Sequence, residues 1–117
     1  MRALAHVLAR KAAAAKLTFT QDFAGFDDAG HLNCARLDRT IRSLARRGAT
    51  SAELCVHPGL GAGDTGGRLA WGYRWADELR AICAPATHDA VNTSGLQLGT
   101  YATLAASRAA AALQQLD

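Results

Sequence analysis

A strand pattern that lies between two helix patterns constrains the fold of this chain most. In the segment Ser51–His57, every second side chain is apolar, namely Ala52, Leu54 and Val56. An alternation with a period of two is typical of a half-buried β-strand. A strand with helices on both sides is typical of folds in which helices cover a parallel sheet. The sequence therefore predicts an α/β fold.

Apolar residues recur at helical spacing on both sides of this strand. The periodic stretches, which we expect to be helices, cover residues 4–11, 37–44, 71–82 and 104–116. Pro85 is expected to open a shorter helix, because proline fits the first helical turn, and this helix should stop by Gly95. Gly48 is expected to cap the helix that precedes the strand.

Two further strands are predicted. Leu17–Thr20 is short and β-branched, and Leu96–Tyr101 alternates in the same way as the first strand. Phe26–Asn33, which lies between the predicted strands Leu17–Thr20 and Ser51–His57, is rich in turn-forming residues and is expected to be a loop. The result is about three parallel strands with flanking helices.

The size of the chain limits it to one domain. It has 117 residues, of which half are hydrophobic and a fifth are charged, so it is not a disordered tail. Only seven residues are aromatic, so the core must be built largely from Leu, Val, Ile and Ala. Because a chain of this length buries only part of its surface, we expect modest stability, and assembly with a second chain is plausible.

The positive charge is concentrated in the first half. Residues 1–59 carry nine basic and five acidic side chains, a balance of +4, within a total of +3. Five arginines on the outer face of the predicted second helix form a candidate surface for RNA or DNA: Arg36, Arg39, Arg42, Arg46 and Arg47. However, no aromatic residue interleaves with them and Asp38 interrupts the run, so a solvated face is expected and nucleic acid is not the expected partner.

Cysteine usage and hydropathy bear on location. Cys34, Cys55 and Cys83 are far apart and form no CxxC pair, which favours reduced thiols and a cytoplasmic protein. No segment has the apolar length of a membrane-spanning helix, so no membrane partner is expected. Residues 1–21 are basic and acid-free, a composition that transit peptides share, but an ordinary amphipathic helix is favoured.

The candidate chemistry is concentrated at His57. The sequence His57-Pro58-Gly59 stands where a strand runs into a glycine-rich loop, and the carboxyl ends of parallel strands are where sites form. An imidazole there can act as an acid, a base or a ligand near neutral pH. A histidine that only caps the strand is an equally good interpretation of this position. Cys55 shares the strand face of His57, and a buried thiol is favoured over a zinc ligand.

Neighbouring motifs have simpler interpretations. Gly61–Gly66 matches GxGxxG, but no helix follows at once, so we expect a flexible loop that borders a pocket and no bound nucleotide. Arg74 and Glu78 are expected to form an exposed pair one helical turn apart. His31 follows Gly30 in a loop and is a weaker candidate for lining a cleft.

Taken in order, four segments resemble the YdjC-like carbohydrate deacetylases, a family that includes the chitooligosaccharide deacetylases and hopanoid-biosynthesis-associated members. The segments are residues 20–25 (TQDFAG), 52–59 (AELCVHPG), 73–79 (YRWADEL) and 96–101 (LQLGTY). The resemblance spans about Leu4 to Tyr101. It implies a distorted (β/α) barrel and the hydrolysis of an N-acetyl group on an amino sugar, with a divalent metal ion, Mg or Zn, in the complete family member.

The same resemblance assigns residues. It makes His57 the catalytic residue and places Asp22, Gly25, Pro58 and Gly59 around the substrate pocket. The metal ligands of the family lie in an Asp-Asp-containing motif and a His-x-His motif in its N-terminal half. Here the only adjacent aspartates, Asp27 and Asp28, are in a predicted loop and no two histidines are close, so we find neither motif.

We therefore expect residues 1–117 to be a single partial domain, the C-terminal portion of a deacetylase. This portion should hold no metal by itself and be inactive without an N-terminal half, and it should be prone to self-association. The alternatives are a stand-alone module that binds a saccharide or a protein, and the basic module for RNA or DNA.

Overall fold

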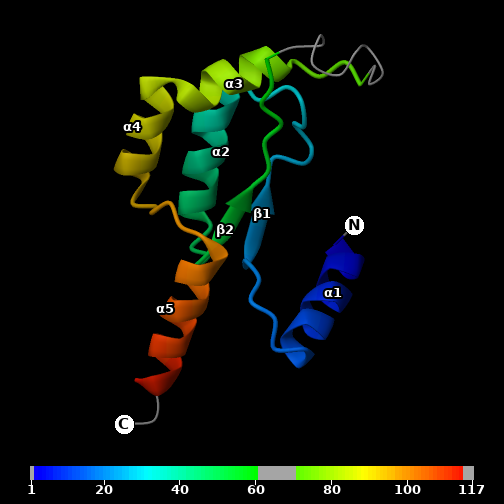
Figure 1. Cartoon of the computed structure of the whole chain (residues 1–117), viewed down its shortest axis with the longest axis vertical. Helices are drawn as coiled ribbons and strands as arrows, with labels where there is room; N and C mark the ends of the chain where they lie inside the picture. Colours follow the sequence, from blue (N-terminus) through cyan, green and yellow to red (C-terminus); the bar gives the residue numbers. More distant parts are fainter. Residues whose placement is uncertain (1, 61–70, 115–117) are drawn as a thin grey trace. The chain divides into compact units, whose positions relative to one another are not determined.

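The computed structural model describes residues 2–60 and 71–114, and Figure 1 labels their helices and strands. Within this part of the chain the fold is α/β, which confirms the predicted class, and the sheet is not closed into a barrel. The elements in chain order are α1 (Arg2–Ala14), β1 (Asp22–Ala24), α2 (Cys34–Arg46), β2 (Ala52–Leu54), α3 (Trp75–Cys83), α4 (Pro85–Ser94) and α5 (Tyr101–Leu113).

The sheet is a short parallel pair. Phe23 in the middle of β1 lies opposite Glu53 in the middle of β2. The strand predicted over Ser51–His57 is therefore present but shorter. Pairing stops after Ala24 because Gly25, at φ +92°, passes close to the backbone of Cys55: a Cβ on Gly25 would lie 2.1 Å from the Cys55 carbonyl oxygen. β1 therefore ends at Ala24 and β2 ends at Leu54.

The strand predicted at Leu17–Thr20 is wrong. The backbone leaves α1 through Lys16, which has a positive φ of 55°, and pairing with the second strand begins later. The amide of Asp22 donates to the Ser51 carbonyl at 3.1 Å, and β1 starts there. The β-branched composition indicated an extended segment, but hydrogen-bond partners decide where a strand begins.

The strand predicted at Leu96–Tyr101 is also wrong. Gly95 ends α4 in the left-handed conformation (φ +77°), as the sequence predicted. Thr100 and Thr103 then form a reciprocal capping box: the Thr100 side chain accepts from the Thr103 amide at 3.2 Å, and the Thr103 hydroxyl accepts from the Thr100 amide at 2.8 Å. These bonds start α5 at Tyr101.

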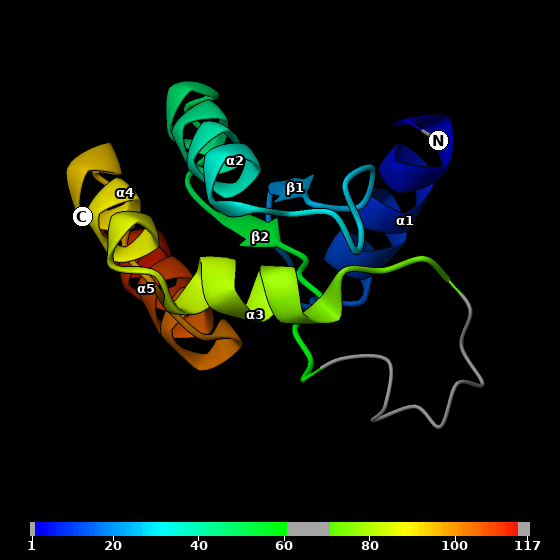
Figure 2. The ribbon, with the colours of Figure 1, turned by 90° about the horizontal axis from the view of Figure 1, so that it is seen from above.

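The chain divides into two compact units, of which residues 21–97 form one. Its core lies among α2, α3 and α4, where the buried side chains are those of Leu37, Ile41, Ala81 and Ala90. Figures 1 and 2 show α2 and α4 side by side, with α3 crossing their ends on the side toward which the strands run. The side chain of Asn33 caps α2 by accepting from the Arg36 amide at 3.0 Å.

The other unit comprises residues 1–20 and 98–117, as far as they are described. The helix predicted over residues 4–11 is confirmed as part of α1, but its apolar side chains are exposed: Leu4 by 62%, Val7 by 51% and Leu8 by 57%. In the same unit, Arg108 of α5 donates to the Phe19 carbonyl at 2.8 Å. None of the described helices combines the length and the apolar character needed to span a bilayer.

Candidate functional site

His57 lies just beyond the carboxyl end of β2, and a side chain of α3 holds its backbone. The His57 amide donates to Glu78 Oε2 at 2.6 Å. A second loop is attached to the same carboxylate, because the Leu32 amide donates to Glu78 Oε1 at 3.0 Å. One carboxylate therefore fixes the segment after β2 and the segment before α2 in relation to α3.

Glu78 is fully buried, with 0% of the residue exposed. The expectation that it forms an exposed pair with Arg74 is wrong, since Arg74 pairs with Asp77 in the first turn of α3. A buried carboxylate is tolerated when hydrogen bonds satisfy its oxygens, as the two amides do here. The sequence contains an indication of this burial. Glu78 lies at helical spacing from Trp75 and Ile82, on the face that the sequence predicts to be apolar.

The imidazole of His57 lies between a carboxylate and a thiol. Its Nδ1 is 3.9 Å from Glu78 Oε2, and its Nε2 is 3.9 Å from Cys55 Sγ. Within the described residues Nδ1 is buried without a hydrogen-bond partner, while 27% of the side chain is exposed. The ring therefore has one edge inside the protein and another part that a ligand can reach.

Aromatic rings extend from this imidazole to the surface. The Tyr73 ring meets His57 edge-on, with centroids 5.1 Å apart, and also contacts Trp75 at 5.0 Å and Trp71 at 5.4 Å. Trp71 is 57% exposed. The helix predicted over residues 71–82 begins only at Trp75, because Gly72 takes a positive φ of 67°. Trp71 and Tyr73 are consequently in the loop before α3. We call these rings, with His57, the aromatic cluster.

Gly30 makes room for this cluster. It has a φ of +76°, and a Cβ there would lie 2.2 Å from Cγ of Tyr73. The Gly30 carbonyl accepts from the Arg74 amide at 2.7 Å, which holds the loop of Tyr73 in place. His31, the next residue, has its ring centroid 6.4 Å from that of Tyr73. The loop predicted at Phe26–Asn33 is confirmed, and it forms the base of the cluster.

The structure brings together some of the residues that the sequence singled out. Gly25 abuts the backbone of Cys55, and the Gly59 amide donates to the Trp75 carbonyl at 3.2 Å, while Pro58 is exposed beside His57. Asp22 is not with them. It starts β1, at the opposite end of the parallel pair, where its carboxylate binds Arg47 at 3.0 Å.

A small polar hollow adjoins the cluster. It lies between the first turns of α2 and α3 and is lined by His31, Asn33, Arg36, Arg74 and Asp77. Both arginines are already engaged, Arg36 with Asp28 at 3.0 Å and Arg74 with Asp77. The hollow therefore offers hydrogen-bond donors and acceptors beside aromatic rings. Because its arginines are paired with carboxylates, its lining does not carry charge of a single sign.

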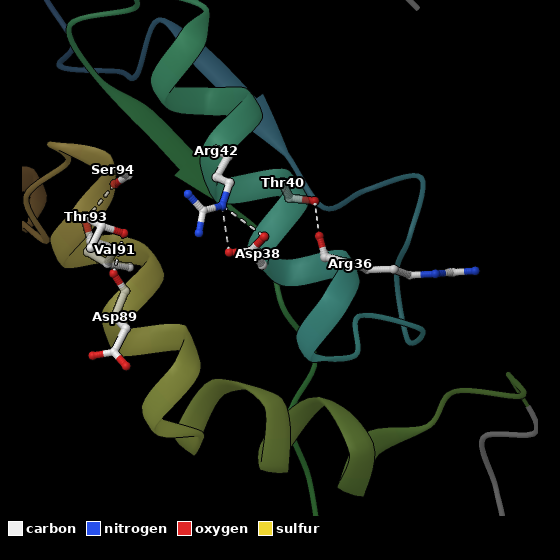
Figure 3. Close-up of polar contacts among 8 residues, drawn as sticks. All are labelled: Arg36, Asp38, Thr40, Arg42, Asp89, Val91, Thr93 and Ser94. Atoms are coloured by element: carbon white, nitrogen blue, oxygen red, sulfur yellow. Dashed lines mark hydrogen bonds and ion pairs between the residues drawn. The ribbon is translucent and has the colours of Figure 1, made fainter.

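The arginine face of α2 is partly neutralised. Arg42 Nε donates to both Asp38 oxygens, at 2.9 and 3.0 Å (Figure 3), and this hydrogen bond, with the attraction of the charges, raises the pKa of Arg42 above its ordinary value. Arg36 and Arg47 also bind carboxylates. In α4, the Thr93 hydroxyl donates to the Asp89 carbonyl and the Ser94 hydroxyl to the Val91 carbonyl, so both bind the backbone of their own helix (Figure 3).

A metal ion does not fit the residues described. Across residues 2–60 and 71–114, no three His, Cys, Asp or Glu side chains gather where one ion could bind them. The Cys55–His57 pair supplies two donors at most. The glycine-rich motif Gly61–Gly66 lies outside the described residues.

No family model, curated protein or solved structure matches this chain.

Proposed function

We propose that this chain forms one wall of the substrate pocket of a metal-dependent carbohydrate N-deacetylase, as the C-terminal part of a distorted (β/α) barrel. The observation that carries the proposal is the aromatic cluster, which joins the imidazole of His57 to the exposed ring of Trp71 at the carboxyl end of β2. In parallel α/β proteins, this edge of the sheet is where ligands bind.

The cluster suits an amino sugar. Flat aromatic rings can cover the C–H face of a pyranose ring, and a few polar groups beside them can bond its hydroxyl and acetamido groups. Trp71 supplies an exposed ring, and the hollow lined by Asn33 and Arg74 supplies the polar groups. Pro58 is exposed next to His57, and the Gly59 amide donates to the Trp75 carbonyl, so both residues lie beside the aromatic cluster.

His57 is the chemical group in this proposal. An imidazole near neutral pH can donate a proton to the amine that leaves when an N-acetyl bond is hydrolysed. The buried carboxylate of Glu78 holds the His57 backbone, and the imidazole packs edge-on against Tyr73. Because the described residues do not fit a metal ion, no catalytic step through a metal is assigned to this chain, and the Mg or Zn ion of the complete site would need donors from elsewhere.

The same aromatic cluster favours a second candidate, a saccharide-binding module without hydrolytic activity. Both candidates require binding of N-acetylglucosamine oligomers, and they differ in whether acetate is released once an N-terminal half with metal ligands is added. One binding experiment therefore tests both functions, and a measurement of acetate release distinguishes them.

Isothermal titration calorimetry with N-acetylglucosamine oligomers tests the shared step. We expect saturable binding that Trp71→Ala abolishes and that His57→Ala weakens. Tyr101→Ala is the matched control, because Tyr101 is 53% exposed and lies in α5, outside the cluster. Absence of binding, or equal effects of the Trp71 and Tyr101 substitutions, would contradict the proposal. Acetate release by the chain alone would show that it holds its own metal ligands.

A further inference from the structure

Cys55, His57 and Glu78 form a row of three groups whose order matters chemically. The thiol Sγ is 3.9 Å from His57 Nε2, and Nδ1 on the other side of the same ring is 3.9 Å from Glu78 Oε2. Thiol, imidazole and carboxylate in this order are the components of a cysteine nucleophile with its base and the group that positions the base.

Local structure explains why the three groups meet. Cys55 and His57 are two residues apart, directly after β2, and their side chains approach each other, with Sγ 3.9 Å from Nε2. Glu78 enters from α3 and fixes the His57 backbone through the 2.6 Å bond to its amide. Cys55 is half-buried, and its own backbone is fixed because its amide donates to the Ala24 carbonyl at 2.9 Å.

We propose that Cys55 is a nucleophilic thiol that accepts acyl groups from activated esters or thioesters, with His57 as its base and Glu78 as a positioning residue. The Cys55 proton passes to His57 Nε2, and the sulfur attacks the acyl carbonyl carbon. The new C–S bond replaces the bond to the leaving group, which takes the proton from His57. Water then hydrolyses the acyl-cysteine, which releases the carboxylic acid and restores the thiol. This inference does not depend on the proposed sugar site.

The other cysteines provide the contrast. Cys34 and Cys83 are both exposed, and within the described residues neither contacts an imidazole. If exposure alone governed reactivity, both would react before Cys55. Cys34 opens α2, and the N-terminus of a helix attracts anionic reagents and ligands. Cys83, the last residue of α3, lacks that advantage and is therefore the appropriate reference.

The test uses the full chain with Cys34→Ser and a limiting amount of para-nitrophenyl acetate near neutral pH. Acetylation of Cys55 and of Cys83 is measured in the same sample by peptide mass spectrometry. We expect Cys55 to react about a hundredfold faster or more, the lower end of the gain typical of a positioned base. His57→Gln should remove this advantage while circular dichroism stays native. If Cys83 reacts as fast as Cys55, or if His57→Gln leaves the ratio unchanged, the proposal is overturned.

Glu78→Gln tests the positioning role with the same ratio. If the variant unfolds, both thiols become exposed, the ratio of the Cys55 to the Cys83 acetylation rate approaches one, and the native circular dichroism is lost. Loss of positioning in a folded chain lowers the Cys55 rate and leaves the Cys83 rate unchanged, and this is the result we expect. A folded Glu78→Gln chain with an unchanged ratio would show that the carboxylate has no part in the reactivity. If this variant does not fold, the His57→Gln result decides the proposal.

Discussion

The helices α2 and α1 have the same length and opposite surroundings. Each has 13 residues and a sequence-predicted apolar face. The face of α2 is buried, with Ile41 4% exposed, whereas Leu8 on the face of α1 is 57% exposed. Periodicity therefore identifies the apolar face of a helix, but it does not show that another element covers that face. The self-association predicted from the sequence remains a prediction, and α1 is one surface where it would act.

The same contrast extends to the units that contain these helices. In residues 21–97, backbones approach closely and a carboxylate is fully buried, whereas the side chains of Leu4, Val7 and Leu8 in α1 are each more than half exposed. We therefore expect substitutions within residues 21–97 to lower the free energy of unfolding much more than comparable substitutions in α1. The predictions below test this difference from the largest expected effect to the smallest.

Gly25→Ala should have the largest effect. Its Cβ would lie 2.1 Å from the Cys55 carbonyl oxygen, and its φ of +92° is strained for alanine. Because a backbone atom cannot yield as a side chain does, we expect a loss above about 4 kcal/mol or failure to fold. Gly48→Ala is the matched control: φ is +69°, nothing lies within 4 Å of the added Cβ, and about 1 kcal/mol is expected. Equal losses in urea unfolding would contradict the close packing.

Ile41→Ala and Leu8→Ala compare the two helices directly. Removal of the Ile41 side chain leaves a cavity in the core and should cost about 2–5 kcal/mol in the free energy of unfolding. Leu8→Ala should change it by less than about 0.5 kcal/mol, because the Leu8 side chain is already largely exposed. Chemical denaturation of both variants at low protein concentration measures the difference. A loss of several kcal/mol for Leu8→Ala would mean that α1 is covered in solution.

Glu78→Gln and His57→Ala should have smaller effects. Replacement of one carboxylate oxygen by an amide nitrogen leaves a buried backbone amide without its acceptor, which costs about 1–3 kcal/mol. His57→Ala retains the amide that Glu78 binds, so we expect a loss below about 1 kcal/mol. Thermal unfolding of the two variants checks this order. The reverse order would mean that the imidazole itself stabilises the fold.

Much of the helical structure could be predicted from the sequence because apolar spacing, Pro85 and Gly95 act locally. The two strand predictions failed for different reasons, one local and one non-local. A strand at Leu96–Tyr101 fits its alternation, but the capping box of Thr100 starts a helix instead. Pairing partners, which a single sequence does not show, set the start of β1 at Asp22.

The place of His57 just beyond β2 could be predicted, because a strand pattern runs into Pro58 and Gly59 and this signal is contained in adjacent residues. Its role in a site stays a prediction. Glu78 was misassigned because its pairing with Arg74 satisfied a local rule, whereas its bonds to Leu32 and His57 join residues 46 and 21 positions apart. Burial of this carboxylate depends on tertiary structure, which helical spacing alone only suggests.

Amide hydrogen exchange of Leu32 and His57 tests most directly whether the buried Glu78 carboxylate holds the backbones of these two residues in place. Both amides donate to Glu78, so both should exchange as slowly as the core amides of α2. In a folded Glu78→Gln chain at least one of the two should exchange much faster, while the α2 amides stay protected. Fast exchange of both amides in the unsubstituted chain would contradict the account.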